Sequence, residues 1–177
     1  MSRIYILSLA LVLTTFLTFS AEAQKKPVKK TTSKTTTKPA PTVVPPLEVR
    51  AAREKVDNQR GNVNLFVDKF GPVAQSLEDF AAMAKTKTPV ASAAAANDKN
   101  KEGVVTALRN LKAGLADLES EFRTKPALQK YLPNVQGITD LAAQAEDSAL
   151  AGKFIASKEP LRQISQKLTD ALGVIPQ

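Results

Sequence analysis

The chain has 177 residues, of which 25 are basic and 17 acidic, and it contains neither histidine nor cysteine. The lack of both residue types excludes Ser-His-Asp and Cys-His nucleophile activation, imidazole and thiolate zinc sites, covalent C-x-x-C-H haem attachment and disulfide-stabilised folds. The seven glycines are scattered, so the sequence has no glycine-rich phosphate loop. We therefore expect a protein that is not an enzyme and holds no cofactor.

The first 23 residues are predicted to form a cleaved secretory signal peptide. Arg3 gives a basic start, residues 4–17 form an apolar stretch, and residues 21–23 (AEA) form a small-residue cleavage motif. The apolar stretch is shorter than the roughly 20 residues that span a bilayer, and the chain has no cysteine for a bacterial lipid anchor. The sequence predicts cleavage after Ala23 and a secreted or periplasmic protein without a transmembrane segment in its mature chain.

A basic tail of low complexity is predicted over residues 24–46, which contain six lysines and no acidic residue. The tail is rich in Thr, Lys and Pro and has too few apolar groups to offset the entropy of ordering, so we expect it to be disordered. It is a flexible spacer, an electrostatic contact for an anionic envelope component, or a stalk glycosylated on threonine. Specific nucleic-acid binding is not expected, because the tail lacks aromatic side chains for base stacking. The lysines that would make the electrostatic contact are Lys25, Lys26, Lys29, Lys30, Lys34 and Lys38.

Residues 47–177 are predicted to form one helical domain, because apolar residues recur at alternating intervals of three and four. The first stripe runs from Val49 to Ala84, and only Gln59 interrupts it. A glycine-proline pair ending at Pro72 lies inside the stripe, yet the apolar register continues through it unshifted. This pattern predicts one long first helix, kinked at the proline.

The second segment has the most regular spacing in the chain, from Val104 to Phe122. Asn97 and Asp98 precede it, and either residue is a suitable N-cap, so we expect the second helix to begin there. No stretch shows the alternation of β-branched residues that a strand requires, which predicts an all-α fold.

The third stripe runs from Leu128 to Ala149 and is expected to stop at Gly152, a typical residue just past a helix end. Pro133 is expected to separate a short turn from the main part of this segment. The fourth helix is expected to start after Ser157, whose hydroxyl can cap it. Its apolar stripe consists of Leu161, Ile164, Leu168 and Leu172.

These four segments predict an up-down-up-down four-helix bundle with a long, kinked first helix, preceded by the disordered basic tail. The first stripe would be about 54 Å long against about 37 Å for residues 98–122, so residues 47–60 are expected to overhang the bundle. A weak apolar seam there, formed by Val49, Ala52 and Val56, would be open to a second subunit in a homodimer or to another partner. The alternative is that this stretch frays or folds back.

Clustered carboxylates are the remaining candidates for acid-base chemistry. The triplet on the second segment falls between the apolar positions, so most of its members are expected to face water. The clusters are Asp117 with Glu119 and Glu121, Glu78 with Asp79, and Glu146 with Asp147.

Residues 61–177 resemble the soluble periplasmic four-helix cytochromes, both the b-type cytochrome bundle and cytochrome c-prime. The resemblance lies in the helix order and in the short turn at residues 151–154 (AGKF). Those proteins bind haem through a histidine near the end of the last helix. In the covalent group this histidine belongs to a C-x-x-C-H motif, and in the other group a methionine is its partner. Residues 168–177 contain neither the histidine nor the C-x-x-C-H motif. Met83 lies at the end of the first predicted helix. The resemblance therefore implies the bundle without haem and without electron transfer.

Three functions remain open. The preferred one is an exported, non-catalytic bundle that binds an unknown protein or an anionic envelope component, or scaffolds the envelope, with the tail as spacer or tether. The first alternative is a carrier of a small apolar ligand held within the bundle, and the second is a cytochrome-like relative that has lost haem. The rings that would surround an apolar ligand, and that core packing also explains, are Phe66, Phe70, Phe80, Phe122 and Phe154.

Overall fold

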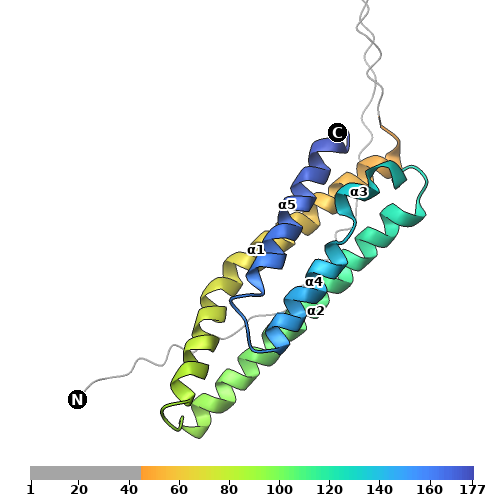
Figure 1. Ribbon diagram of the computed structural model, residues 1–177. Helices are drawn as coiled ribbons and strands as arrows, with labels where there is room; N and C mark the ends of the chain where they lie inside the picture. Colours follow the sequence, from red (N-terminus) through yellow and green to blue (C-terminus); the bar gives the residue numbers. More distant parts are fainter. Residues whose placement is uncertain (1–44) are drawn as a thin grey trace, which may run out of the picture. The chain divides into compact units, whose positions relative to one another are not determined.

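The computed structural model describes residues 45–177, and over that range the chain is helical and contains no strand (Figure 1). The predicted all-α class is therefore confirmed. The predictions for the signal peptide and for tail residues 24–44 lie outside the described residues. The helical elements are α1 (Leu47–Ala84), α2 (Ala91–Thr124), the 3-10 turn η1 (Gln129–Tyr131), α3 (Leu132–Val135), α4 (Ile138–Leu150) and α5 (Lys158–Val174).

The four long helices lie side by side around a shared apolar core. Helix α1 packs against α2 and α5, and helix α4 packs against the same two helices. The short elements η1 and α3 sit between α2 and α4 in the chain, and α3 contacts both α2 and α5. Each long helix therefore has two long neighbours, and their apolar stripes face one another.

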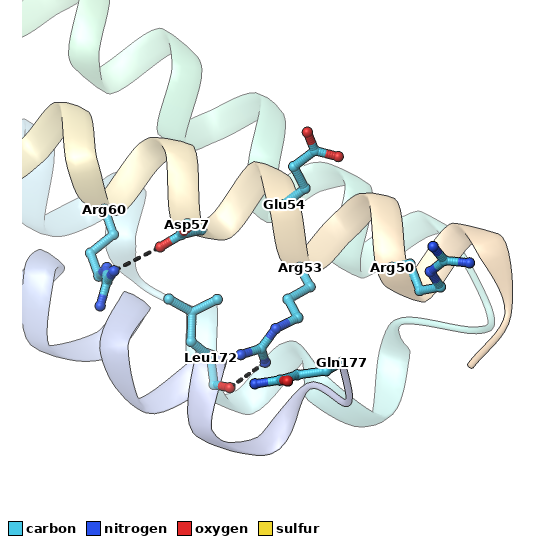
Figure 2. A pocket seen from close by; sticks show the side chains of 7 residues that line it. All are labelled: Arg50, Arg53, Glu54, Asp57, Arg60, Leu172 and Gln177. Atoms are coloured by element: carbon cyan, nitrogen blue, oxygen red, sulfur yellow. Dashed lines mark hydrogen bonds and ion pairs between the residues drawn. The ribbon is translucent and has the colours of Figure 1, made fainter. Parts of the chain in front are cut away.

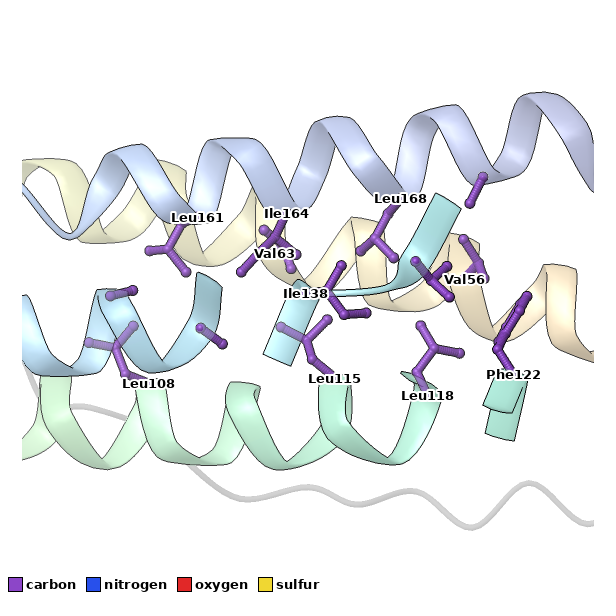
Figure 3. Packing of buried hydrophobic residues seen from close by; sticks show 14 of the residues in the cluster. Val56, Val63, Leu108, Leu115, Leu118, Phe122, Ile138, Leu161, Ile164 and Leu168 are labelled. Carbon is purple, nitrogen blue, oxygen red and sulfur yellow. The ribbon is translucent and has the colours of Figure 1, made fainter. Parts of the chain in front are cut away.

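Aliphatic and aromatic side chains from all four long helices fill this core (Figure 3). Complete burial of one such side chain stabilises a fold by about 1.5–3 kcal/mol, which allows a domain without disulfides to hold together. The labelled core residues in Figure 3 are Val56 and Val63 from α1, Leu108, Leu115, Leu118 and Phe122 from α2, Ile138 from α4, and Leu161, Ile164 and Leu168 from α5.

Helix α1 is continuous through Pro72, as the unshifted register predicted. Pro72 is exposed, whereas Phe70 and Ala74 on either side of it are buried. A proline ring cannot donate a backbone hydrogen bond, so the carbonyl of Asp68 loses its helical partner on the exposed face of the helix. The core-facing stripe is therefore unbroken.

Helix α2 begins at Ala91, earlier than predicted. Asn97 is only 7% exposed and lies inside the helix, so the prediction of an N-cap at Asn97 or Asp98 was wrong. Alanine has the highest helix propensity of all residues, and the alanine run at residues 93–96 extends the helix towards its N-terminus.

The third segment is divided at two places: the short turn η1 ends at Tyr131, just before Pro133 as predicted, and a second break lies at Gly137. Pro133 occupies the first turn of α3, where the missing N–H has no helical acceptor to lose. The unpredicted break is at Gly137, whose φ of 86° lies in the left-handed region that glycine adopts at low cost. Helix α4 starts at the next residue.

Helix α4 ends in a Schellman motif, which confirms the predicted stop at Gly152. The N–H of Gly152 donates to the carbonyl of Ala149, and the N–H of Lys153 donates to the carbonyl of Ser148. Gly152 has a φ of 74°, which this motif requires. Helix α5 then begins at Lys158, after Ser157 as predicted. The Ser157 hydroxyl does not cap α5, because it donates back to the carbonyl of Lys153.

Gly152→Ala is expected to lower the free energy of unfolding by about 1–2 kcal/mol, because a Cβ is strained at positive φ. The matched control is Gly61→Ala. Gly61 lies inside α1, and a Cβ added there would meet nothing within 4 Å. That control is expected to raise the free energy of unfolding by about 0.5–1 kcal/mol through helix propensity. Urea unfolding followed by circular dichroism measures both, and equal effects would contradict the turn geometry.

The predicted overhang of residues 47–60 was wrong. Val49, Ala52 and Val56 are 2%, 0% and 0% exposed and belong to the domain's own core, so they offer no seam to a partner. The Arg53 guanidinium reaches across to the carbonyls at the end of α5, which places that end beside the start of α1. Val49 also lines a cavity together with residues of the segment between α2 and α4.

Candidate binding site at the N-terminal end of the domain

A charged cavity of about 540 Å³ lies where α1 begins and α5 ends (Figure 2). Three arginines of α1 line it, and their intervals of three and seven residues place them on one face of the helix. Two carboxylates on α1 and the end of α5 complete the lining. The lining residues are Arg50, Arg53, Glu54, Asp57, Arg60, Leu172 and Gln177.

The three arginines have different neighbours, as Figure 2 shows. Arg53 donates to the carbonyls of Leu172 and Ile175, which have no helical partner at the end of α5. Arg60 donates to Asp57 Oδ1 at 2.7 Å. Arg50 is exposed and forms no ion pair with the described residues. Arg53 therefore fixes the end of α5, and Arg50 remains available to a ligand.

Arginine is suited to binding carboxylate and phosphate groups, because its planar guanidinium presents several N–H donors in a fixed geometry and stays charged at all physiological pH values. The lining carries three guanidiniums and only two carboxylates, Glu54 and Asp57, and Asp57 is paired with Arg60. The chemistry of the lining fits recognition of an anion and provides no activated nucleophile.

A second cavity of about 540 Å³ lies at the same end and is mainly apolar. The Lys130 ammonium lies 4.8 Å from the centre of the Tyr131 ring, which is a cation–π contact. Four prolines form rigid walls, and two of them are the last two residues of the basic tail. The lining residues are Pro45, Pro46, Val49, Pro126, Ala127, Lys130, Tyr131 and Pro176.

Glu119 is buried, which corrects the expectation that the carboxylates of its triplet mostly face water. It accepts hydrogen bonds from the N–H of Gly137 at 3.1 Å, and from the N–H and hydroxyl of Thr139 at 3.2 and 2.9 Å. Burial alone would raise the pKa of Glu119, but these bonds and the nearby Arg123 charge outweigh it, so the pKa is lowered. Glu119 therefore caps the N-terminus of α4 from another helix.

Glu146 is also buried, at 6% exposure, and connects α4 to α2. It accepts a hydrogen bond from Arg109 Nε at 2.7 Å and another from Lys112. The bonds from Lys112 and Arg109 lower the pKa of Glu146 against the effect of burial. A carboxylate held ionised between two cations is a structural contact and a poor general acid.

Glu121 connects α2 to α1 through an ion pair with Lys55 at 2.6 Å. It also pairs with Lys125, the residue that follows α2. Burial would raise the pKa of Glu121, but the hydrogen bonds from Lys125 and Lys55 lower it. Asp117 is exposed, as predicted. The carboxylates of the triplet thus separate into one solvated residue and two that join helices.

The five phenylalanines do not come together around a shared cavity. Phe66 and Phe70 are stacked with ring centres 5.3 Å apart, and Phe70, Phe122 and Phe154 are buried in the core. Phe66 and Phe80 are half-buried. None of the five lines either of the two cavities described above.

The arginine row on α1 is not evident from composition, because the domain's positive and negative charges nearly cancel when they are counted together. The six tail lysines lie outside the described residues. The row was detectable from its spacing, since Arg50, Arg53 and Arg60 follow the helical period beside the apolar stripe. Its meeting with the end of α5 was not detectable, because that contact joins residues more than a hundred positions apart.

Comparison of the chain with protein-family models, curated proteins and solved structures found no match. The likeness to the four-helix cytochromes therefore stays a prediction. Within residues 45–177, no group of three or more acidic, histidine or cysteine side chains is placed to hold a metal ion. In the same range, no helix combines the length and the apolar character needed to cross a membrane.

Proposed function

We propose that this protein is an exported, non-catalytic helical bundle that attaches to an anionic component of the cell envelope and acts there as a binding or scaffold protein. One observation supports the attachment above all others. Residues 24–60 contain ten basic and three acidic residues, a net charge of +7, against +8 for the whole chain. The basic charge is therefore concentrated in the tail and in the start of α1.

The two parts of this basic region provide different kinds of contact. The tail lysines are point charges on flexible stems, which attract an anionic surface in a salt-dependent way. The arginines of α1 are carried by the helix, and Arg50 and Arg60 line the charged cavity, where the anionic group would bind. In this proposal the tail provides affinity and the arginine row orients the bundle.

The proposal includes two finer points of architecture. The domain is an up-down-up-down bundle, which the packing of α1 against α2 and α5, and of α4 against the same helices, supports. Helix α1 bends at Pro72, because proline removes a hydrogen bond and crowds the preceding turn. An experimental structure in which the axis of α1 runs straight through Pro72 would contradict the second point.

The tail is tested by replacing its six lysines with glutamine in the chain that begins at Gln24. Binding to vesicles rich in anionic lipid, or to an anionic polymer, is expected to fall at least about a hundredfold at low salt, since each basic residue near an anionic membrane contributes about 1 kcal/mol. The matched control is a tail of the same composition in shuffled order, which should bind like the natural one. Co-sedimentation over a salt series gives both affinities.

The arginine row is tested separately by Arg50→Gln, with Arg162→Gln on α5 as the matched control. Both arginines are exposed, and Arg162 lies outside both cavities. Only Arg50→Gln is expected to weaken binding. If the natural chain shows no binding at low salt, or if the lysine-to-glutamine tail binds unchanged, the attachment proposal is wrong.

The two alternative functions have weaker support. A carrier of a small apolar ligand would need space beside the phenylalanine rings, but three of the five are buried in the packed core. A bundle derived from a haem protein would explain the fold resemblance without adding an activity. Binding of an apolar fluorescent fatty acid, lost in a Phe122→Leu variant, would favour the carrier.

A further inference from the structure

The α1–α2 pair extends beyond α4 and α5 at the end opposite to the one predicted (Figure 1). The connection between α4 and α5 meets α1 at Glu78, where the N–H of Ile155 donates to the carboxylate at 2.7 Å. The last buried residue of α1 is Leu77, and the first of α2 is Asn97. Residues 78–96, here called the hairpin tip, therefore consist of two helix ends and a turn that project beyond α4 and α5.

The hairpin tip has an exposed apolar surface. Met83 is 42% exposed and Val90 is 73% exposed, and Phe80 is half-buried. Eight of its 19 residues are alanine, seven of them exposed. Small side chains allow helix axes to approach closely, but a pair of alanine-rich helices has too little volume to bury a core of its own. At the level of the tip the bundle therefore has two helices, whereas the rest of the domain has four.

We propose that two copies of this chain associate through their hairpin tips, packed side by side and antiparallel, so that each copy provides the two helices that the other lacks. A two-fold axis makes every contact occur twice, which is the commonest symmetry of soluble oligomers. The resulting cross-section has four helices, like the rest of the domain.

The charges of the tip favour a second copy over an anionic surface. The two acids, Glu78 and Asp79, lie at its base, and the two lysines, Lys85 and Lys87, lie in its turn. In an antiparallel pair the turn of one copy lies beside the base of the other, so each lysine pair faces an acidic pair. The tip has no net charge, and an anionic bilayer would therefore attract it little.

The size of the tip sets the expected strength. Stable protein interfaces use about 20–30 residues on each side, and the tip has 19. The dimer is therefore expected to be weak and concentration-dependent. This proposal does not rest on the attachment of the basic tail, which precedes the N-terminus of α1 in the sequence.

The test is the mass of the chain from Gln24 over a wide range of concentrations, measured by sedimentation equilibrium and light scattering. The natural chain is expected to move from monomer to dimer. Met83→Glu with Val90→Glu should raise the dissociation constant at least about tenfold. The matched control is Leu65→Glu, because Leu65 is 54% exposed on α1 but lies outside the tip. This variant should have the same dissociation constant as the natural chain. Thermal unfolding checks that each variant is folded.

A charge-reversal pair tests the antiparallel register. Lys87→Glu is expected to weaken the dimer, and Asp79→Lys added to it should restore the dimer. A chain that stays monomeric throughout would overturn the proposal, as would a dimer that Met83→Glu with Val90→Glu leaves intact. Vesicle binding that these two changes abolish in a strictly monomeric chain would also overturn it, in favour of a lipid contact.

Discussion

Phe122→Ala is expected to lower the free energy of unfolding by about 3–5 kcal/mol, the largest effect of any single change considered. Phe122 has no exposed surface and lies in the core, which is formed by all four long helices (Figure 3). Truncation removes the transfer free energy of the ring and leaves a cavity that rigid neighbours cannot fill. Without a disulfide, the domain has no covalent constraint to compensate.

The matched control for Phe122→Ala is Leu65→Ala. Leu65 is 54% exposed, so its truncation should change the free energy of unfolding by less than about 0.5 kcal/mol. Urea unfolding monitored by far-ultraviolet circular dichroism measures both. A loss below about 1 kcal/mol for Phe122→Ala would contradict the core packing described above.

Glu119→Ala is expected to lower the free energy of unfolding by about 2–3 kcal/mol, because it leaves partly buried donors of Gly137 and Thr139 without their acceptor. Glu119→Gln keeps an acceptor oxygen but loses the charge, so it should cost less than the alanine change. The matched control is Asp117→Ala, an exposed carboxylate two positions away that should have little effect. Equal effects at the two positions would contradict the capping of α4.

The contribution of Glu119 should also depend on pH. Its pKa in the folded protein is lowered from the ordinary value of 4.5, so the ionised carboxylate stabilises the fold above the pKa of the unfolded chain. That stabilisation is lost as pH falls from about 4.5 through the folded-state pKa. The difference in stability between the natural chain and Glu119→Ala should shrink over this range. A difference that stays constant from neutral to acid pH would show that the charge plays no part.

Much of the fold could be predicted from the sequence, because helix formation and the apolar stripes depend on local spacing. The stripe through Pro72 and the stop at Gly152 are both local patterns, and both are present in the structure. The start of α2 differs from the prediction because the helix propensity of the alanines before Asn97 extends the helix past this potential capping residue.

The direction of the overhang could not be predicted from helix lengths. The helix lengths show that α1 is longer than the later helices. The offset between the α1–α2 pair and the α4–α5 pair depends on the connecting segments. The end of α5 contacts the start of α1 through Arg53, and Tyr131 of the segment between α2 and α4 lines the same cavity as Val49. Helix α4 therefore begins further along the bundle, and the uncovered part of α1 is its C-terminal end.

Only the basic charge near the candidate site could be predicted from the sequence. Composition identified the lysine-rich tail, but the cavity beside it needs Arg53 to meet the carbonyls at the end of α5, a contact that no local pattern reveals. The burial of Glu119 has the same origin, since its hydrogen-bond donors belong to a turn on another element. In both cases the missing information was the pairing of distant segments.

Amide hydrogen exchange of the chain from Gln24, with and without anionic vesicles, tests the proposed attachment most directly. Binding is predicted to slow exchange in peptides from residues 24–60 at low salt, and to leave residues 104–122 of the core unchanged. Slower exchange confined to the core would contradict the account in favour of an internal ligand. Slower exchange confined to the hairpin tip, or no change anywhere, would contradict attachment through the basic end.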